Sequence, residues 1–320
     1  MNKTPTTKDL EALTDDYGVW QHATEHSITK SEGYALDDVA RALIVFLKYN
    51  KPDQARVCIN YINDSIKDGA FIGFFNQERE PIVYPSSYDA AALAVLSICF
   101  AINANFEVTT CKNILGKIDF NIFDGSEHIR GFSYLVIANS LFKIERLEKY
   151  HELILPKFDK NNWFENKMTY ANAIIPLALL EYYSKNQNEE TLKTIIKTSI
   201  ATLELHMRIG VIPAPIGNRE HYVLGSMNRD VYGQQPIDAG FMVILMCRAY
   251  ELFKEDIYLK SATEWLEWFY VNNVFKQSLI RDNSACCDGI DAHGLSTNYG
   301  SESTIIFLWA SKVFNDVIKP

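Results

Sequence analysis

The feature that most constrains the fold is a polar helix opening that recurs six times along the 320-residue chain. Each opening leads into a segment that is apolar on almost every face, which is typical of a buried helix. The openings are marked by Asp38, Asp89, Arg130, Asn172, Gln235 and Glu302. The markers lie 51, 41, 42, 63 and 67 residues apart, the length of a helical hairpin with variable loops. The chain is therefore predicted to repeat a helical hairpin about six times.

Apolar residues recur at helical spacing in most long segments, and strand-like alternation is scarce. The predicted helices span 36–49, 52–67, 88–103, 108–117, 128–144, 146–155, 168–185, 188–208, 235–254, 257–273 and 302–317. Short connectors at 50–51, 186–187 and 255–256 make paired helices antiparallel neighbours. No proline-rich or glycine-rich linker divides the chain. The sequence thus predicts an all-α fold, an (α/α)6 toroid in one domain over 1–320, with the polar openings at a shared mouth.

Helix capping is the alternative explanation of the openings, because short polar side chains at helix starts satisfy free backbone N–H groups. Capping accounts easily for residues such as Asp37. It accounts poorly for Arg130, Tyr170, Gln234 and Gln235, which are weak caps. These four residues favour a shared polar mouth.

The bulk properties of the chain narrow the possible partners. A formal net charge of −9 argues against nucleic acid, whose phosphates need a basic face. The polar start of the chain and the lack of a run of about 18 apolar residues predict a cytoplasmic protein without a membrane partner. Scattered cysteines are predicted to be core residues; they are Cys58, Cys99, Cys111, Cys247, Cys286 and Cys287. A redox role for the adjacent pair at 286–287 is the alternative.

Carboxyl groups at the predicted mouth suit the cleavage of a glycosidic bond, which needs one protonated and one ionised carboxyl group around the anomeric carbon. The candidates are Asp37, Asp38, Asp89, Asp238, Asp288 and Glu302. We favour Asp38 with Glu302 as the catalytic pair, followed by Asp238 or Asp288. Each could instead be a cap or an ion-pair partner, as Asp38 would be with Arg41 one helical turn away.

Planar polar and aromatic side chains near the openings suit sugar hydroxyls and sugar faces. The predicted substrate-binding residues are His22, Tyr34, Asp37, Arg41, Asp89, Arg130, Trp163, Tyr170, Asn172, Gln234, Gln235 and Asn298. The chain has no nucleophile elbow, phosphate-binding loop or dinucleotide fingerprint, and His22 and His26 lack a zinc signature. We expect no cofactor and no metal.

Several blocks of residues resemble an uncharacterised prokaryotic family of six-hairpin toroids, encoded beside or fused to glycosyltransferases and near mannoside phosphorylases. That family carries Gln-His-Ala and then Gly-Tyr-Cys-Thr-Asp-Asp-Asn-Ala-Arg-Ala-Leu. The matching blocks lie in the same order at 21–23, 33–34, 37–38, 40–43, 163–165, 169–170, 215–218, 234–237, 288–289 and 300–304. The resemblance implies a toroid of the glycosidase-like superfamily, which includes glycosidases, epimerases and lyases.

The chain also departs from that pattern at the mouth. Ala171 and Ile174 replace an acid and an arginine, Gly233 replaces an acid, and Asp238 stands where glutamate is usual. The leading hypothesis remains a glycoside hydrolase acting on a manno- or gluco-configured oligosaccharide. A non-catalytic glycan-binding partner of a glycosyltransferase is the first alternative. The second is a sugar epimerase or isomerase, for which His22 and His128 would be the candidate bases.

Overall fold

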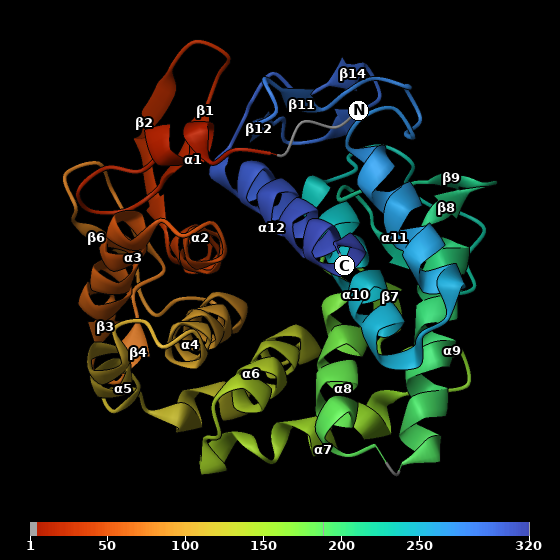
Figure 1. The fold of residues 1–320 in the computed structure, drawn as a ribbon, viewed down its shortest axis with the longest axis horizontal. Helices are drawn as coiled ribbons and strands as arrows, with labels where there is room; N and C mark the ends of the chain where they lie inside the picture. The colour runs from red at the N-terminus through yellow and green to blue at the C-terminus, as the bar shows by residue number, and fades with distance from the viewer. Residues whose placement is uncertain (1–4, 188, 320) are drawn as a thin grey trace.

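Six helices form a closed inner ring in the computed structural model, which describes residues 5–187 and 189–319 (Figure 1). They are α2 (Leu36–Lys48), α4 (Tyr88–Asn103), α6 (Ile129–Leu141), α8 (Ile174–Lys185), α10 (Pro236–Phe253) and α12 (Ser301–Ile318). Each packs on the next, and α12 packs on α2, which closes the ring. The predicted all-α (α/α)6 toroid is confirmed.

An outer ring of helices surrounds the inner one. Its members are α1 (Lys8–Ala12), α3 (Pro52–Asp64), α5 (Val108–Leu115), α7 (Tyr150–Ile154), α9 (Glu190–His206) and α11 (Asp256–Trp268). Helices α3 to α11 each pack on the inner helix that precedes them, whereas α1 packs on α12. The chain therefore completes its sixth hairpin by pairing the two ends of the sequence.

The helix predictions broadly agree with the structure, and the three main departures are the helices predicted at 146–155 and 168–185 and the unpredicted α1. The predicted helix 146–155 is the short α7 between two 3₁₀ turns, η2 (Glu145–Leu147) and η3 (Leu155–Lys157). A further 3₁₀ turn, η1 (Phe120–Gly125), precedes α6. The predicted helix 168–185 begins only at Ile174, because Ala171 adopts a left-handed φ of 51° and the Asn172 side chain bonds the backbone of Thr169. Helix α1 was not predicted.

The long connectors run from each outer helix to the next inner helix, and they carry the strands that the structure describes. A four-stranded antiparallel sheet has the order β1 (Trp20–Ala23), β2 (Ile28–Ala35), β5 (Phe74–Phe75) and β6 (Pro81–Val83). Two-residue strands form the other hairpins: β3 (Ile66–Lys67) with β4 (Ala70–Phe71), β7 (Lys167–Met168) with β10 (Tyr222–Val223), β8 (Arg208–Ile209) with β9 (Ile212–Pro213), β11 (Ile280–Arg281) with β12 (Ala285–Cys286), and β13 (Ile290–Asp291) with β14 (Gly294–Leu295).

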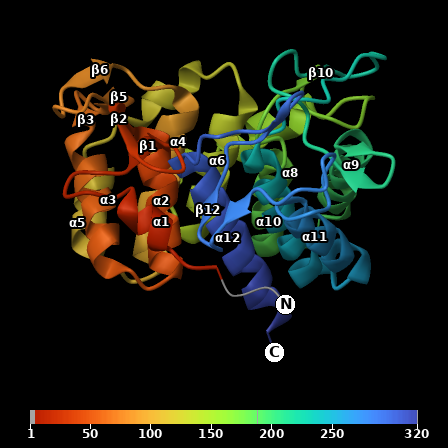
Figure 2. The same cartoon turned by 90° about the horizontal axis from the view of Figure 1, so that it is seen from above.

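The polar openings and the strand-bearing connectors lie at the same end of the ring, since every inner helix begins where a long connector ends (Figure 2). The inner helices are buried along most of their length, which explains why their sequences are apolar on nearly every face. All six cysteines are buried and free, as predicted for core residues. In the described part of the chain, no helix is long and apolar enough to cross a membrane.

Candidate active site at the polar end of the toroid

A cavity of about 240 Å³ opens at the N-terminal ends of α2, α10 and α12. Its lining includes backbone and side chains from the connectors as well as from these helices. The lining residues are Gln21, His22, Ala35, Asp37, Asp38, Phe74, Gln235, Asp288, Gly300, Glu302 and Ser303. Seven of the predicted site residues are therefore brought together here: His22, Asp37, Asp38, Gln235, Asp288 and Glu302 line the cavity, and Arg41 is bonded to three of them.

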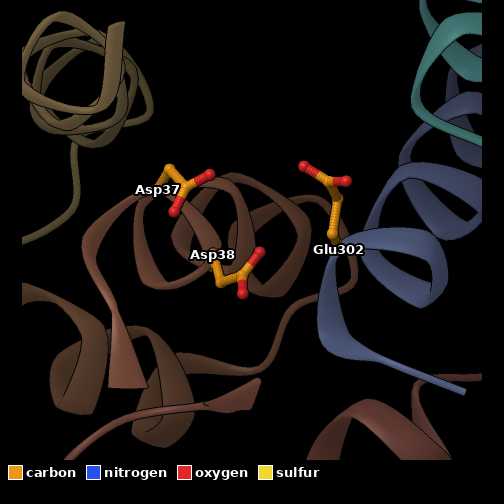
Figure 3. A group of neighbouring side chains, drawn as sticks. All are labelled: Asp37, Asp38 and Glu302. Atoms are coloured by element: carbon orange, nitrogen blue, oxygen red, sulfur yellow. The ribbon is translucent and has the colours of Figure 1, made fainter. Parts of the chain in front are cut away.

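One buried guanidinium group, that of Arg41, organises the carboxylates of this cavity. Its Nη2 lies 2.8 Å from Asp37 Oδ2, and its Nη1 lies 3.1 Å from Asp38 Oδ1 and 3.0 Å from Glu302 Oε1. The helical spacing of α2 places the two aspartates over Arg41, while Glu302 reaches it from α12. Figure 3 shows the three carboxyl groups converging from these two helices. Arg41 thus supplies the positive charge among three acids.

The three carboxyl groups differ in exposure and so in what they can do. Asp38 is buried, and its second oxygen accepts a hydrogen bond of 2.8 Å from the Ser301 hydroxyl. Burial raises the pKa of Asp38 well above its ordinary value, and the nearby Asp37 raises it further. Burial also raises the pKa of Glu302, while Arg41 opposes that rise. Glu302 stays 34% exposed whereas Asp38 is buried, so of these two carboxyl groups a ligand can reach Glu302.

Asp288 meets the cavity from the connector between β12 and β13, in a different setting. Its Oδ1 accepts the Gly300 N–H at 2.9 Å, and its Oδ2 accepts a hydrogen bond from the Asn298 amide. His22 Nδ1 lies 4.0 Å from Asp288 Oδ2 and 2.7 Å from Asn298 Nδ2. Burial raises the pKa of Asp288, although the Gly300 N–H and its other partners oppose the rise. In the described part of the chain, no arginine forms an ion pair with Asp288.

A second polar cluster forms where α4, α6 and α8 begin. Arg130 is buried, and its Nε lies 3.0 Å from Asp89 Oδ2. The Tyr170 hydroxyl donates to the same Asp89 oxygen at 3.1 Å, and the Arg130 guanidinium lies 4.4 Å from the centre of the Tyr170 ring. Glu165 lies 4.0 Å from Arg130 and 3.8 Å from His128. The structure thus joins Asp89, Arg130 and Tyr170, but apart from the cavity lining.

Glu165 belongs to this second cluster although it was not among the predicted site residues. A signal for it exists in the sequence, because the block 163–165 is one of those that resemble the toroid family. The block also contains Trp163, which is predicted from the sequence to be a substrate-binding residue because aromatic rings stack on sugar faces. A carboxylate between Arg130 and His128 is the more informative member of that block.

Asp238 is the most isolated acid of the site. It lies in the first turn of α10 with 1% of its surface exposed, and neither carboxylate oxygen has a hydrogen-bond partner of ordinary geometry among the described residues. Burial raises the pKa of Asp238 to about 7, although the backbone N–H groups of Asn172 and Ala171 oppose the rise. Asp238 is therefore a buried carboxyl group with a raised pKa that does not line the cavity.

The other predicted binding residues are built into the walls of the mouth. Tyr34 donates to Asp15, and Gln234 bonds the Val231 carbonyl and the Trp268 ring N–H. Asn172 holds the backbone of Thr169, and Trp163 is fully buried against Phe164. These four side chains position the connectors, and none of them lines the cavity that contains Asp38 and Glu302.

Capping does not explain the polar openings. Among the inner helices, all of which are described, only α4 has a side-chain cap, formed by Ser87 with the Ala90 N–H at 3.2 Å. The cap positions of α2, α6, α8, α10 and α12 form no side-chain cap. The acids and arginines of the openings bond one another instead, which supports the shared polar mouth.

No protein-family model matches the chain, and no curated protein matches it in sequence. Solved structures share its fold over nearly its whole length. Cellobiose 2-epimerase from Bacillus thermoamylovorans aligns with a TM-score of 0.73 and 12% identity, over 98% of this chain and 96% of that one. D-mannose isomerase aligns at 0.69 and 11%, over 98% and 97%. A GH76 alpha-mannanase from Bacteroides thetaiotaomicron aligns at 0.66 and 10%, over 96% and 93%.

These likenesses define the fold class of the protein. It is the six-hairpin toroid found in enzymes that isomerise, epimerise or cleave sugars. At identities of 10–12% the likeness establishes the fold and leaves the reaction to be argued from the site. Membership of the uncharacterised toroid family stays a prediction from the sequence.

Proposed function

We propose that the protein is a carbohydrate-active enzyme that processes a manno- or gluco-configured oligosaccharide in the cavity at its polar end. The observation that carries the proposal is the pair Glu302 and Asp288, which come from different elements, line one cavity and have pKa values raised by burial. Perturbed carboxyl groups in a cleft are typical of acid–base catalysis. The sugar-processing enzymes that share the fold support the substrate class.

Hydrolysis of a glycosidic bond is the reaction that these two groups suit best. Asp288 has no arginine partner among the described residues, so it is the group that holds a proton and donates it to the departing glycosidic oxygen. Arg41 favours the ionised form of Glu302, which can take a proton from the attacking water or attack the anomeric carbon itself. The bond from the anomeric carbon to the linking oxygen breaks, and the elements of water are added across it.

Asp38 takes a supporting place in this proposal. The Asp38 side chain is only 9% exposed, against 28% for Asp288, and its two oxygens are bonded to Arg41 and to Ser301. Sequence reasoning paired Asp38 with Glu302 as acid and base. The hydrogen bonds favour a different role, in which Asp38 positions Arg41 and Arg41 in turn holds Glu302.

Epimerisation or isomerisation of a sugar is the second candidate, because His22 borders the same cavity. Its ring lies beside Asn298 and Asp288, so an ionisable base sits within reach of a bound sugar. His128, the other candidate base, is 62% exposed beside Glu165 in the second cluster. Hydrolysis and epimerisation or isomerisation would use the same cavity, and the two reactions differ in the product that they form.

Product analysis separates these reactions. The purified protein is incubated with manno- and gluco-oligosaccharides and with free mannose and glucose, and proton NMR follows the anomeric signals. We expect new reducing ends from an oligosaccharide, with Glu302→Gln and Asp288→Asn each lowering the rate by about 10²–10⁴-fold. Glu190→Gln, an exposed substitution on outer helix α9, is the matched control and should keep full activity.

Three other results would contradict hydrolysis in this form. Unchanged turnover in Glu302→Gln and Asp288→Asn would remove these two residues from the reaction. A changed hexose without chain shortening, lost in His22→Asn, would identify an epimerase or isomerase. Sugar binding without any product would favour the non-catalytic glycan-binding alternative. An association with a glycosyltransferase and a cytoplasmic location stay predictions from the sequence.

A further inference from the structure

A second cavity adjoins the first one at the polar end of the toroid. It also measures about 240 Å³, and the two cavities share Gln235 and Asp288 as lining residues. The rest of its lining comes from three connector segments, with Asn218, Arg219, Gly233, Gln234, Gly289, Ile290, Asp291 and Ser296. The proton donor proposed above therefore stands at the border between two compartments of equal size.

Backbone hydrogen bonds fix the three segments that build the second cavity. The Asn218 N–H donates to the Gly233 carbonyl at 3.1 Å, and Gln234 and Ile290 exchange two hydrogen bonds of 3.0 Å. The Ser296 N–H donates to the Gly289 carbonyl at 2.9 Å. Walls tied together in this way need no rearrangement when a ligand enters, which is typical of a preformed binding site.

Two glycines allow these segments to approach so closely. Gly233 has a φ of 80°, and a Cβ there would lie 2.5 Å from Asn218 Oδ1. Gly289 has a φ of 146°, and a Cβ there would lie 2.1 Å from the Gln234 carbonyl oxygen. Any side chain at either position would push the walls apart, so the shape of the second cavity depends on both glycines.

The chemistry of the second cavity suits a neutral, hydroxyl-rich ligand. Arg219 Nη2 lies 2.6 and 2.7 Å from the two carboxylate oxygens of Asp291, so the two charges compensate each other. Asn218 and Ser296 add an amide and a hydroxyl group to the lining. A compensated arginine beside planar amides and carboxylates offers donors and acceptors for sugar hydroxyls, but no free positive charge for a phosphate.

We infer that the second cavity binds a second sugar unit, so that the ligand is a disaccharide or longer and its linkage lies beside Asp288 and Gln235. The inference rests on the proposed function, because it extends the same site. It assigns a binding role to Asn218, Arg219, Asp291 and Ser296. It also explains why a proton donor stands at the border, where the linking oxygen would lie.

Calorimetric titration of the Glu302→Gln variant tests the inference without turnover. The probes are the α- and β-linked mannobioses and glucobioses, together with mannose and glucose. We expect at least one disaccharide to bind about tenfold more tightly than its monosaccharide. Adding Arg219→Ala or Asp291→Ala should remove that margin and leave the monosaccharide affinity within about twofold. Both side chains are about half exposed, so the fold should tolerate either change.

Arg56→Ala is the matched control, because it breaks an exposed arginine–aspartate pair on outer helix α3 and should change neither affinity. Equal affinities for disaccharides and monosaccharides would overturn the second subsite while leaving the proposed function intact. An equal loss for both ligands in Arg219→Ala and Asp291→Ala would also overturn it. Failure of every sugar to bind would contradict the proposed function as well, so the two failures are distinguishable.

Discussion

At the scale of single residues, the site depends on how one arginine is shared. The spacing of Asp37, Asp38 and Arg41 on one helix predicts their ion pairs, and the structure contains them. Glu302 could be predicted as a mouth residue, but its contact with Arg41 joins opposite ends of the chain and depends on ring closure. The spacing within one helix is readable from sequence, whereas the choice of partner across the ring is not.

The orientation of side chains was the least predictable property of the site. Tyr34, Trp163, Asn172 and Gln234 have the chemistry of sugar-binding residues, and each lies in a mouth segment. In the structure, each side chain bonds to or packs against other residues of the wall, and none lines the cavity that contains Glu302. Residue type therefore located the mouth, while the turn geometry of each connector decided which way the side chain points.

Replacing Asp238 by asparagine should stabilise the protein in a pH-dependent way. The pKa of Asp238 is raised from 3.8 to about 7 by burial, so between these values the folded protein keeps a proton that the unfolded chain has lost. Wild-type stability then falls as the pH rises through this window and levels off above it. Asparagine is always neutral, so Asp238→Asn should gain up to about 4 kcal/mol at about pH 8 and little at about pH 4.

Urea unfolding of the two proteins at both pH values measures this difference. Asp53→Asn, at an exposed position on outer helix α3, is the matched control and should show no such pH-dependent gain. A gain for Asp238→Asn that is the same at both pH values would contradict the raised pKa of the buried Asp238.

At the scale of elements, the inner helices were predictable because each is a segment of 12–18 residues that is apolar on almost every face, which is too long for a buried strand. The strands were not, since most have only two residues, and the longer β1 and β2 show no alternation between buried and exposed positions. Helix α1 was also missed, because five residues give little more than one helical turn. The late start of α8 reflects the turn at Thr169 to Asn172, where side-chain hydrogen bonds replace the first helical turn.

The contact between α10 and α12 makes a sharp packing prediction. A Cβ on Gly240 would lie 2.3 Å from Ile306 Cγ1 and 3.2 Å from the Ile306 carbonyl oxygen. Gly240→Ala should therefore lower the free energy of unfolding by about 1–3 kcal/mol through overpacking. Gly116→Ala is the control, because its Cβ would meet only ordinary contacts at 3.4 Å. Chemical denaturation measures both, and equal stabilities for the two variants would contradict the close packing of these helices.

At the scale of the whole molecule, the spacing of the openings predicted the ring but not the subdivision of its mouth. The openings of α2, α10 and α12 share a cavity, and those of α4, α6 and α8 supply a separate cluster around Arg130. The sequence pattern does not distinguish these two groups of openings, because every opening has the same position in its hairpin. Their division arises from the connectors, whose lengths and paths differ around the ring.

The central claim is that an oligosaccharide binds at the polar end of the toroid with its linkage beside Asp288. A crystal structure of the Glu302→Gln variant, soaked with the disaccharide that binds most tightly, tests this most directly. We expect one sugar ring in the cavity lined by Glu302 and the next in the cavity lined by Asn218 and Ser296, with the linking oxygen within hydrogen-bond distance of Asp288. Sugar density elsewhere on the protein, with both cavities empty, would contradict the account.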